Sequence, residues 1–136
     1  VIKALTESGG MIGFSLYPHH LRGGSDCTLQ SFCEMEADTA ERFGIEHIGI
    51  GSDLCQDQPD SVVEWMRNGR WTTDRDFGEG SADNPGFPDQ PSWFRDSRDF
   101  PNINSGLKQV GFDDSAVCAV MGNNWLRFFE RSFVPA

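Results

Sequence analysis

The nine residues from Ile45 to Asp53 constrain the fold of this chain more than any other stretch. They read IEHIGIGSD. The first six residues are rich in isoleucine and lie between Gly44 and Gly51, and Ser52 and Asp53 come directly after Gly51. Such a run predicts a buried strand from Ile45 to Gly51. An acid just past the carboxyl end of a strand is where α/β barrels hold their chemistry, although aspartate is also a common turn residue. Asp53 is therefore either a site residue on the rim of a sheet or a turn cap.

A strand and a helix precede this run. Residues 11–16 (MIGFSL) predict a strand that leads into a loop over 17–24. Thr28 is a predicted N-cap, and the helix that follows has Phe32, Met35, Thr39 and Phe43 on one face before Gly44 ends it. The order strand, helix, strand predicts a βαβ unit with a right-handed crossover and a parallel sheet.

Parallel strands bring the residues that follow them to one edge of the sheet. Tyr17, His19 and His20 follow the first strand and Asp53 follows the second. Ligands of such sheets bind outside the carboxyl ends of the strands, so we expect these four side chains to lie near one another. Adjacent histidines in extended backbone point to opposite sides, so one of His19 and His20 is expected to face the pocket. For His47, a structural hydrogen bond is expected rather than a ligand role.

The rest of the chain predicts helices around one long irregular stretch. Residues 1–8 predict the end of a helix, with Ile2 and Leu5 on one face and Gly9 and Gly10 after it. Residues 56–100 are rich in Pro, Gly and Trp, and only 61–68 resembles a helix. A lid or substrate-facing loop is the favoured interpretation of this stretch, and an oligomer contact is the main alternative.

Three further helices are predicted in the C-terminal part of the chain. The first spans 103–110, and the second begins with Asp113 or Asp114 as its cap and runs through Met121. A break at 122–124 (GNN) separates it from the third, over 125–133, whose apolar stripe is expected to pack in the core. That stripe consists of Leu126, Phe129 and Phe133.

Composition narrows the classes of function. With 136 residues the chain has room for one ordinary domain, or for roughly half of an eight-stranded barrel of about 250 residues. Eleven Lys and Arg against 21 Asp and Glu give a net charge of −10, which argues against nucleic acid and anionic membrane surfaces as partners. No apolar run approaches the roughly 20 residues that span a bilayer. Phosphate-binding glycine loops, the G-x-S-x-G elbow and the H-E-x-x-H helix do not occur either.

The four cysteines lack the C-x-x-C spacing of zinc knuckles and redox motifs. Cys33 and Cys118 fall in predicted helices, where we expect them to be small buried apolar groups. Cys27 and Cys55 lie in loops near the strand ends, where a functional thiol is a minor alternative.

Several segments together resemble a known family. They are 10–13 (GMIG), 16–18 (LYP), 48–53 (IGIGSD), 100–103 (FPNI) and 122–127 (GNNWLR), and their order is similar to the C-terminal part of the membrane (renal-type) dipeptidases. The resemblance covers residues 10–55 and 99–131. It implies an α/β fold, namely the C-terminal fragment of a (β/α)₈ TIM barrel of the metal-dependent hydrolase type. It also implies hydrolysis of dipeptides through a centre of two Zn²⁺ ions.

The resemblance carries over to three site residues. Asp53 matches the aspartate after the last barrel strand, to which the family assigns the proton passed to the leaving amine. His20 stands where relatives often have an aromatic that lines the pocket, so a substrate-binding role is implied for it. Tyr17 begins the loop that shapes the same pocket.

The family's metal ligands precede the region that this chain resembles. Residues 1–136 are therefore expected to be the C-terminal portion of a single barrel domain, with the long loop at 56–100 and with both zinc ions held from outside this segment. The remainder of the barrel, on the same or a separate chain, a dipeptide substrate and a second copy in a homodimer are the expected partners. A bacterial cytoplasmic location is expected. Two alternatives stay open: a barrel relative that binds or serves biosynthesis without hydrolysis, and an amidohydrolase-like barrel acting on a non-peptide amide.

Overall fold

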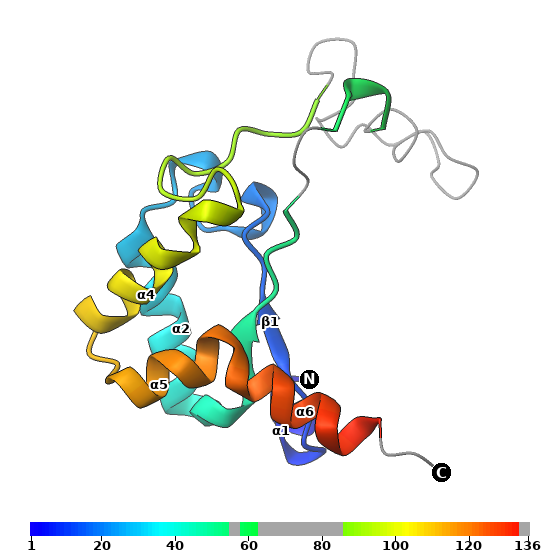
Figure 1. The fold of residues 1–136 in the computed structure, drawn as a ribbon, viewed down its shortest axis with the longest axis vertical. Coiled ribbons are helices and arrows are strands. Elements are labelled where there is room, and N and C mark those ends of the chain that lie inside the picture. The colour runs from blue at the N-terminus through cyan, green and yellow to red at the C-terminus, as the bar shows by residue number, and fades with distance from the viewer. Residues whose placement is uncertain (55–57, 63–85, 134–136) are drawn as a thin grey trace.

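The structure is a computed structural model that describes residues 1–54, 58–62 and 86–133 (Figure 1). Within those ranges two strands, β1 (Ile12–Phe14) and β2 (Ile48–Ile50), form a parallel pair in which Gly13 lies beside Gly49. The longer helices are α1 (Ile2–Glu7), α2 (Leu29–Phe43), α4 (Phe100–Gln109), α5 (Asp114–Cys118) and α6 (Asn124–Ser132). Short turns η1 (Pro18–His20), η2 (Gly24–Asp26), η3 (Ile45–His47), η4 (Ser97–Asp99) and η5 (Ala119–Asn123) connect them. None of the described helices is long and apolar enough to cross a membrane.

The order β1, α2, β2 confirms the predicted βαβ unit with parallel strands. Thr28 caps α2 as predicted, because its hydroxyl accepts the N–H of Ser31 at 3.1 Å. Gly44 ends the helix with a φ of 94°, a backbone angle that favours glycine. Both strands run towards the same end of the molecule, where the segments 17–27 and 86–97 gather (Figure 1).

The two faces of the strand pair are covered differently. Phe14, which is almost fully buried, meets Phe32 of α2 edge to face, with ring centroids 6.4 Å apart. On the opposite face the strand glycines leave room for the indole of Trp125. A Cβ on Gly49 would lie 2.5 Å from Trp125 Nε1, and one on Gly13 would lie 3.3 Å from the same ring. The glycines at this pair of positions are therefore needed for a close approach of α6 to the sheet.

The second strand is shorter than predicted. Residues 45–47 form the 3₁₀ turn η3, and only Ile48–Ile50 pair with β1. The buried amide of Asn124 explains the correction, because its Nδ2 donates to the carbonyls of Ile45 at 2.7 Å and Ile48 at 2.8 Å. The turn brings both carbonyls within reach of one amide group, so they are hydrogen-bonded without a neighbouring strand.

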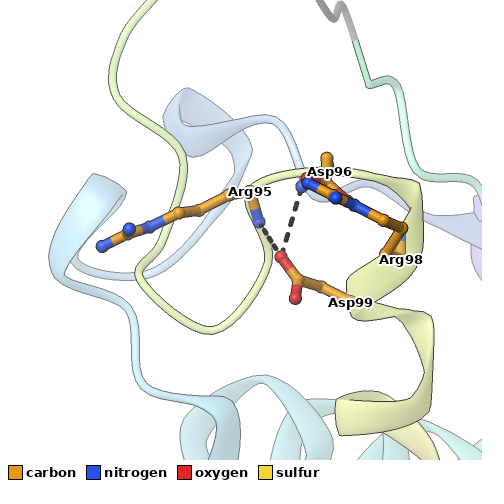
Figure 2. A network of polar contacts seen from close by, with 4 residues as sticks. All are labelled: Arg95, Asp96, Arg98 and Asp99. Carbon is orange, nitrogen blue, oxygen red and sulfur yellow. Dashed lines mark hydrogen bonds and ion pairs between the residues drawn. The ribbon is translucent and has the colours of Figure 1, made fainter.

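A polar network holds η4, the turn that leads into α4, and α4 begins at Phe100 rather than at the predicted residue 103. The Asp99 carboxylate accepts the backbone N–H groups of Arg95 and Asp96, and the Asp96 carboxylate accepts the backbone N–H of Arg98 (Figure 2). Hydrogen bonds from the Arg98 side chain and backbone lower the pKa of Asp96 to about 2. The reciprocal cap holds η4, which leads directly into α4 at Phe100, about one turn earlier than apolar spacing predicts.

Only part of the long stretch at 56–100 belongs to the described residues. Trp93 packs on Phe32 with centroids 5.4 Å apart and donates its indole N–H to the Cys27 carbonyl at 2.7 Å. Phe94 is fully buried. This end of the stretch is thus part of the core. Trp65, Trp71 and most of the predicted helix 61–68 lie outside the described residues, and the lid stays a prediction.

The C-terminal helices correct two expectations. Asp113 is the cap of α5, as one of the two predicted alternatives, but Cys118 at its end is exposed rather than buried. The predicted break is an irregular π-helical segment, η5, after which α6 begins at Asn124. The stripe expected in the core is exposed: 57% for Leu126, 47% for Phe129 and 74% for Phe133. Asn124 and Trp125 hold α6 on β2, and no described element covers the stripe.

Candidate functional site

Polar side chains from both strand ends meet at the carboxyl edge of the sheet. Ser15 follows β1 directly, His20 lies in η1, and Asp53 follows β2 by three residues. His20 Nδ1 lies 4.0 Å from Asp53 Oδ2, and both side chains are more than half exposed, at 59% and 57%. The predicted juxtaposition is therefore present for His20 and Asp53.

Ser15 links the two titratable residues, and sequence reasoning missed it. Its Oγ lies 2.9 Å from His20 Nδ1 and donates to Asp53 Oδ2 at 3.5 Å. The same oxygen accepts the backbone N–H of Tyr17 at 3.1 Å. The one signal that could have identified Ser15 is its place: it leaves β1 at the same edge of the sheet at which Ser52 and Asp53 leave β2.

Backbone hydrogen bonds fix the position of the chain from which the Asp53 side chain extends. Leu16 N–H donates to the Ser52 carbonyl at 3.2 Å, and Gly51 N–H donates to the Phe14 carbonyl at 3.0 Å, so the two chains stay paired past the strands. Asp53 then has a φ of 53°, and it is the one non-glycine residue in the described ranges with a positive φ. Non-glycine residues with such backbone strain cluster at functional sites, and aspartate is among the residues that tolerate it.

The loop after β1 holds both histidines against one aromatic ring. Pro18 begins the 3₁₀ turn η1, so His19 and His20 do not have the extended backbone that the sequence predicted. The Tyr17 ring lies 5.7 Å from the His19 ring and 5.3 Å from the His20 ring, both in edge-on contacts. Of the two histidines, His20 is the one whose ring reaches Ser15 and Asp53.

His47 and Cys27 have structural environments. His47 Nδ1 bonds to the Gly10 carbonyl at 3.0 Å, which agrees with the structural role expected for it. Cys27 is buried, and burial raises the pKa of its thiol, which disfavours the reactive thiolate. Cys55 lies outside the described residues. Across residues 1–54, 58–62 and 86–133, no group of three or more His, Cys, Asp or Glu side chains could hold a metal ion.

The fold is similar to that of a known protein, a crystal structure of an amidohydrolase from Pseudomonas aeruginosa. The two structures superpose with a TM-score of 0.78 at 27% sequence identity, over 93% of this chain. The aligned region makes up 37% of the length of that amidohydrolase, so this chain spans little more than a third of it. No family model matches the sequence. No curated protein matches it either.

Proposed function

We propose that this chain is the C-terminal part of a (β/α)₈ barrel that hydrolyses the amide bond of dipeptides, with Asp53 as the group that carries the proton. The observation that supports the proposal best is the placement of the Asp53 carboxylate beside His20 at the carboxyl edge of two parallel strands. This edge is where barrel enzymes carry their chemistry. The similarity to an amidohydrolase over 93% of the chain favours hydrolysis over binding alone.

Amide hydrolysis needs a group that moves one proton. Water attacks the carbonyl carbon, a C–O bond forms, and the C–N bond breaks. The attacking water loses a proton and the leaving nitrogen gains one, so a single carboxylate can accept the first and supply the second. The exposed Asp53 side chain, in contact with Ser15, is open to a substrate at both positions.

The described residues do not fit a zinc centre, because they include no group of three metal-ligating side chains. The two Zn²⁺ ions implied by the family resemblance would therefore be held by residues outside the described ranges. The role proposed for Asp53 is proton transfer alone and does not require it to bind a metal.

Exposed apolar surface supports the barrel-fragment part of the proposal. The described sheet has two strands, each with one edge that no described strand pairs with, whereas a closed barrel leaves no strand edge unpaired. The stripe of Leu126, Phe129 and Phe133 on α6 is also uncovered. In the proposed barrel, the parts that correspond to the other 63% of the amidohydrolase would cover these surfaces.

The test begins with the protein isolated from its source. We expect an intact mass well above 15.2 kDa, bound zinc, and hydrolysis of a panel of dipeptides. Simple N-acyl amides belong in the panel, because the structural neighbour is an amidohydrolase and a barrel acting on a non-peptide amide is one of the open alternatives. A mass equal to that of this chain with no hydrolysis of either class would favour the binding or scaffold alternative.

The variant Asp53→Asn keeps the size of the side chain and removes its charge. We expect it to lower kcat by about 100-fold or more, the typical loss when a proton-transfer group is removed. Asp38→Asn is the matched control, because Asp38 is an exposed carboxylate on α2. Equal activity of both variants would exclude Asp53 as the proton carrier.

A further inference from the structure

Hydrogen-bond counting at Ser15 favours one of the two neutral tautomers of His20. A hydroxyl has one proton to donate and two lone pairs that accept. Tyr17 N–H occupies one lone pair of Ser15 Oγ, and the Asp53 carboxylate, which can only accept, takes its proton. With the hydroxyl proton directed to Asp53, the contact of 2.9 Å between Ser15 Oγ and His20 Nδ1 corresponds to Nδ1–H donating to the second lone pair.

Electrostatics favours the same arrangement independently. His20 Nδ1 lies 4.0 Å from Asp53 Oδ2. A protonated Nδ1 places positive charge density near the carboxylate, whereas a bare Nδ1 lone pair would face a negative group. A charged acceptor also orients the Ser15 proton towards itself more strongly than a neutral imidazole does.

We propose that Ser15 is a positioning residue that holds His20 as the Nδ1–H tautomer, so that His20 Nε2 presents a lone pair at the site. No hydrogen bond or ion pair occupies Nε2 within the described part of the chain. The site then offers two acceptors, Nε2 and the Asp53 carboxylate. Such a site selects a substrate that presents an N–H donor, which is a property of secondary amides and amines but not of tertiary amides or esters. The substrate part of this inference rests on the proposed function.

The tautomer can be measured directly by long-range ¹H–¹⁵N NMR on protein labelled at histidine. The spectra are recorded about two pH units above 6.5, the ordinary imidazole pKa, so that the rings are neutral. We expect the pattern of Nδ1–H for His20 in the wild type. In Ser15→Ala the acceptor for Nδ1–H is gone, and we expect the tautomer ratio to move about tenfold towards Nε2–H.

Two controls separate positioning from a general loss of structure. Ser15→Thr keeps the hydroxyl and should keep the wild-type pattern. His47 is an internal control, because its Nδ1 faces the Gly10 carbonyl and must donate there, so its Nδ1–H pattern should persist in every folded variant. A wild-type His20 that is mainly Nε2–H, or an unchanged ratio in Ser15→Ala with His47 intact, would overturn the inference.

The substrate part is tested on the intact enzyme. Ser15→Ala should raise KM for a secondary amide with less effect on kcat, and Ser15→Thr should restore it. The NMR result does not depend on turnover. A protein that shows the tautomer shift but hydrolyses no amide would refute the proposed function and leave the role of Ser15 intact. A protein that hydrolyses amides but shows no tautomer shift would refute the role of Ser15 and leave the proposed function intact.

Discussion

The buried carboxyl group of Glu36 should make the stability of this protein strongly dependent on pH. Glu36 lies in α2 and is fully buried, and neither of its carboxyl oxygens has a hydrogen-bond partner among the described residues. Burial raises the pKa of Glu36 from its ordinary value of 4.5 to about 8. Cys33, one turn away on the same helix, interacts electrostatically with Glu36. Burial raises the pKa of the Cys33 thiol to about 12, so this thiol stays neutral between pH 5 and 9.

The sign follows from counting protons. Between pH 4.5 and 8 the folded protein keeps the Glu36 proton while the unfolded chain releases it, so the free energy of unfolding falls as pH rises. Each pH unit costs about 1.4 kcal/mol. Relative to low pH, where Glu36 is protonated in both states, the free energy of unfolding is lower by about 1 kcal/mol at pH 5, about 3 kcal/mol at pH 7 and about 5 kcal/mol at pH 9. The whole free energy of unfolding of a typical domain is roughly 5–15 kcal/mol.

Urea denaturation from pH 5 to 9 measures this loss. Glu36→Met replaces the carboxyl with an apolar chain of similar length, and it should stabilise the protein already at pH 5 by about 1–3 kcal/mol, because an unsatisfied polar group is removed. The difference between variant and wild type should then grow by about 4 kcal/mol up to pH 9. Glu41→Met, at an exposed position of the same helix, is the control. Parallel stability curves for Glu36→Met and wild type would refute the reasoning.

Two predictions concern the contact between α6 and β2. Asn124→Ala removes two hydrogen bonds to strand and turn carbonyls and should lower the free energy of unfolding by about 2–4 kcal/mol in urea denaturation. The control Asn123→Ala, at an exposed neighbouring position, should lower it by less than about 1 kcal/mol. Equal losses in the two variants would contradict the anchoring role of Asn124. Gly49→Ala places a Cβ 2.5 Å from Trp125 Nε1 and should cost about 1–3 kcal/mol and change the environment of that indole in its fluorescence or NMR signal. Gly122→Ala is the control, because the added Cβ meets open space and the free energy of unfolding should change little. An unchanged free energy of unfolding in Gly49→Ala would show that α6 can move away from the sheet at no cost.

The sequence predicted the arrangement of the strand ends because local rules govern it. The Thr28 cap, the Gly44 stop and the β-branched run after it determine a strand, helix, strand order, and parallel pairing then places Tyr17, His20 and Asp53 at one edge. What those rules leave open is which hydroxyl joins them. Ser15 is one residue past β1, and nothing in its own sequence context distinguishes it from any serine after a strand.

The burial of Glu36 and the exposure of the α6 stripe share one physical cause, which is that periodicity identifies residues on a common face but not what lies opposite that face. Phe32 and Glu36 are four residues apart and therefore lie on one face of α2, and both are buried although only Phe32 looks apolar. On α6 the spacing of Leu126 and Phe129 is equally regular, yet their stripe is exposed, because Asn124 and Trp125 are the residues that bond to the β2 carbonyls. Trp125 lies beside the stripe, with its ring stacked on Phe129, and Asn124 lies on the far side of the helix. A helix that meets the sheet through an amide and an indole N–H is oriented by hydrogen bonds to strand carbonyls. Its apolar stripe is then free to face whatever packs against it from beyond the described residues.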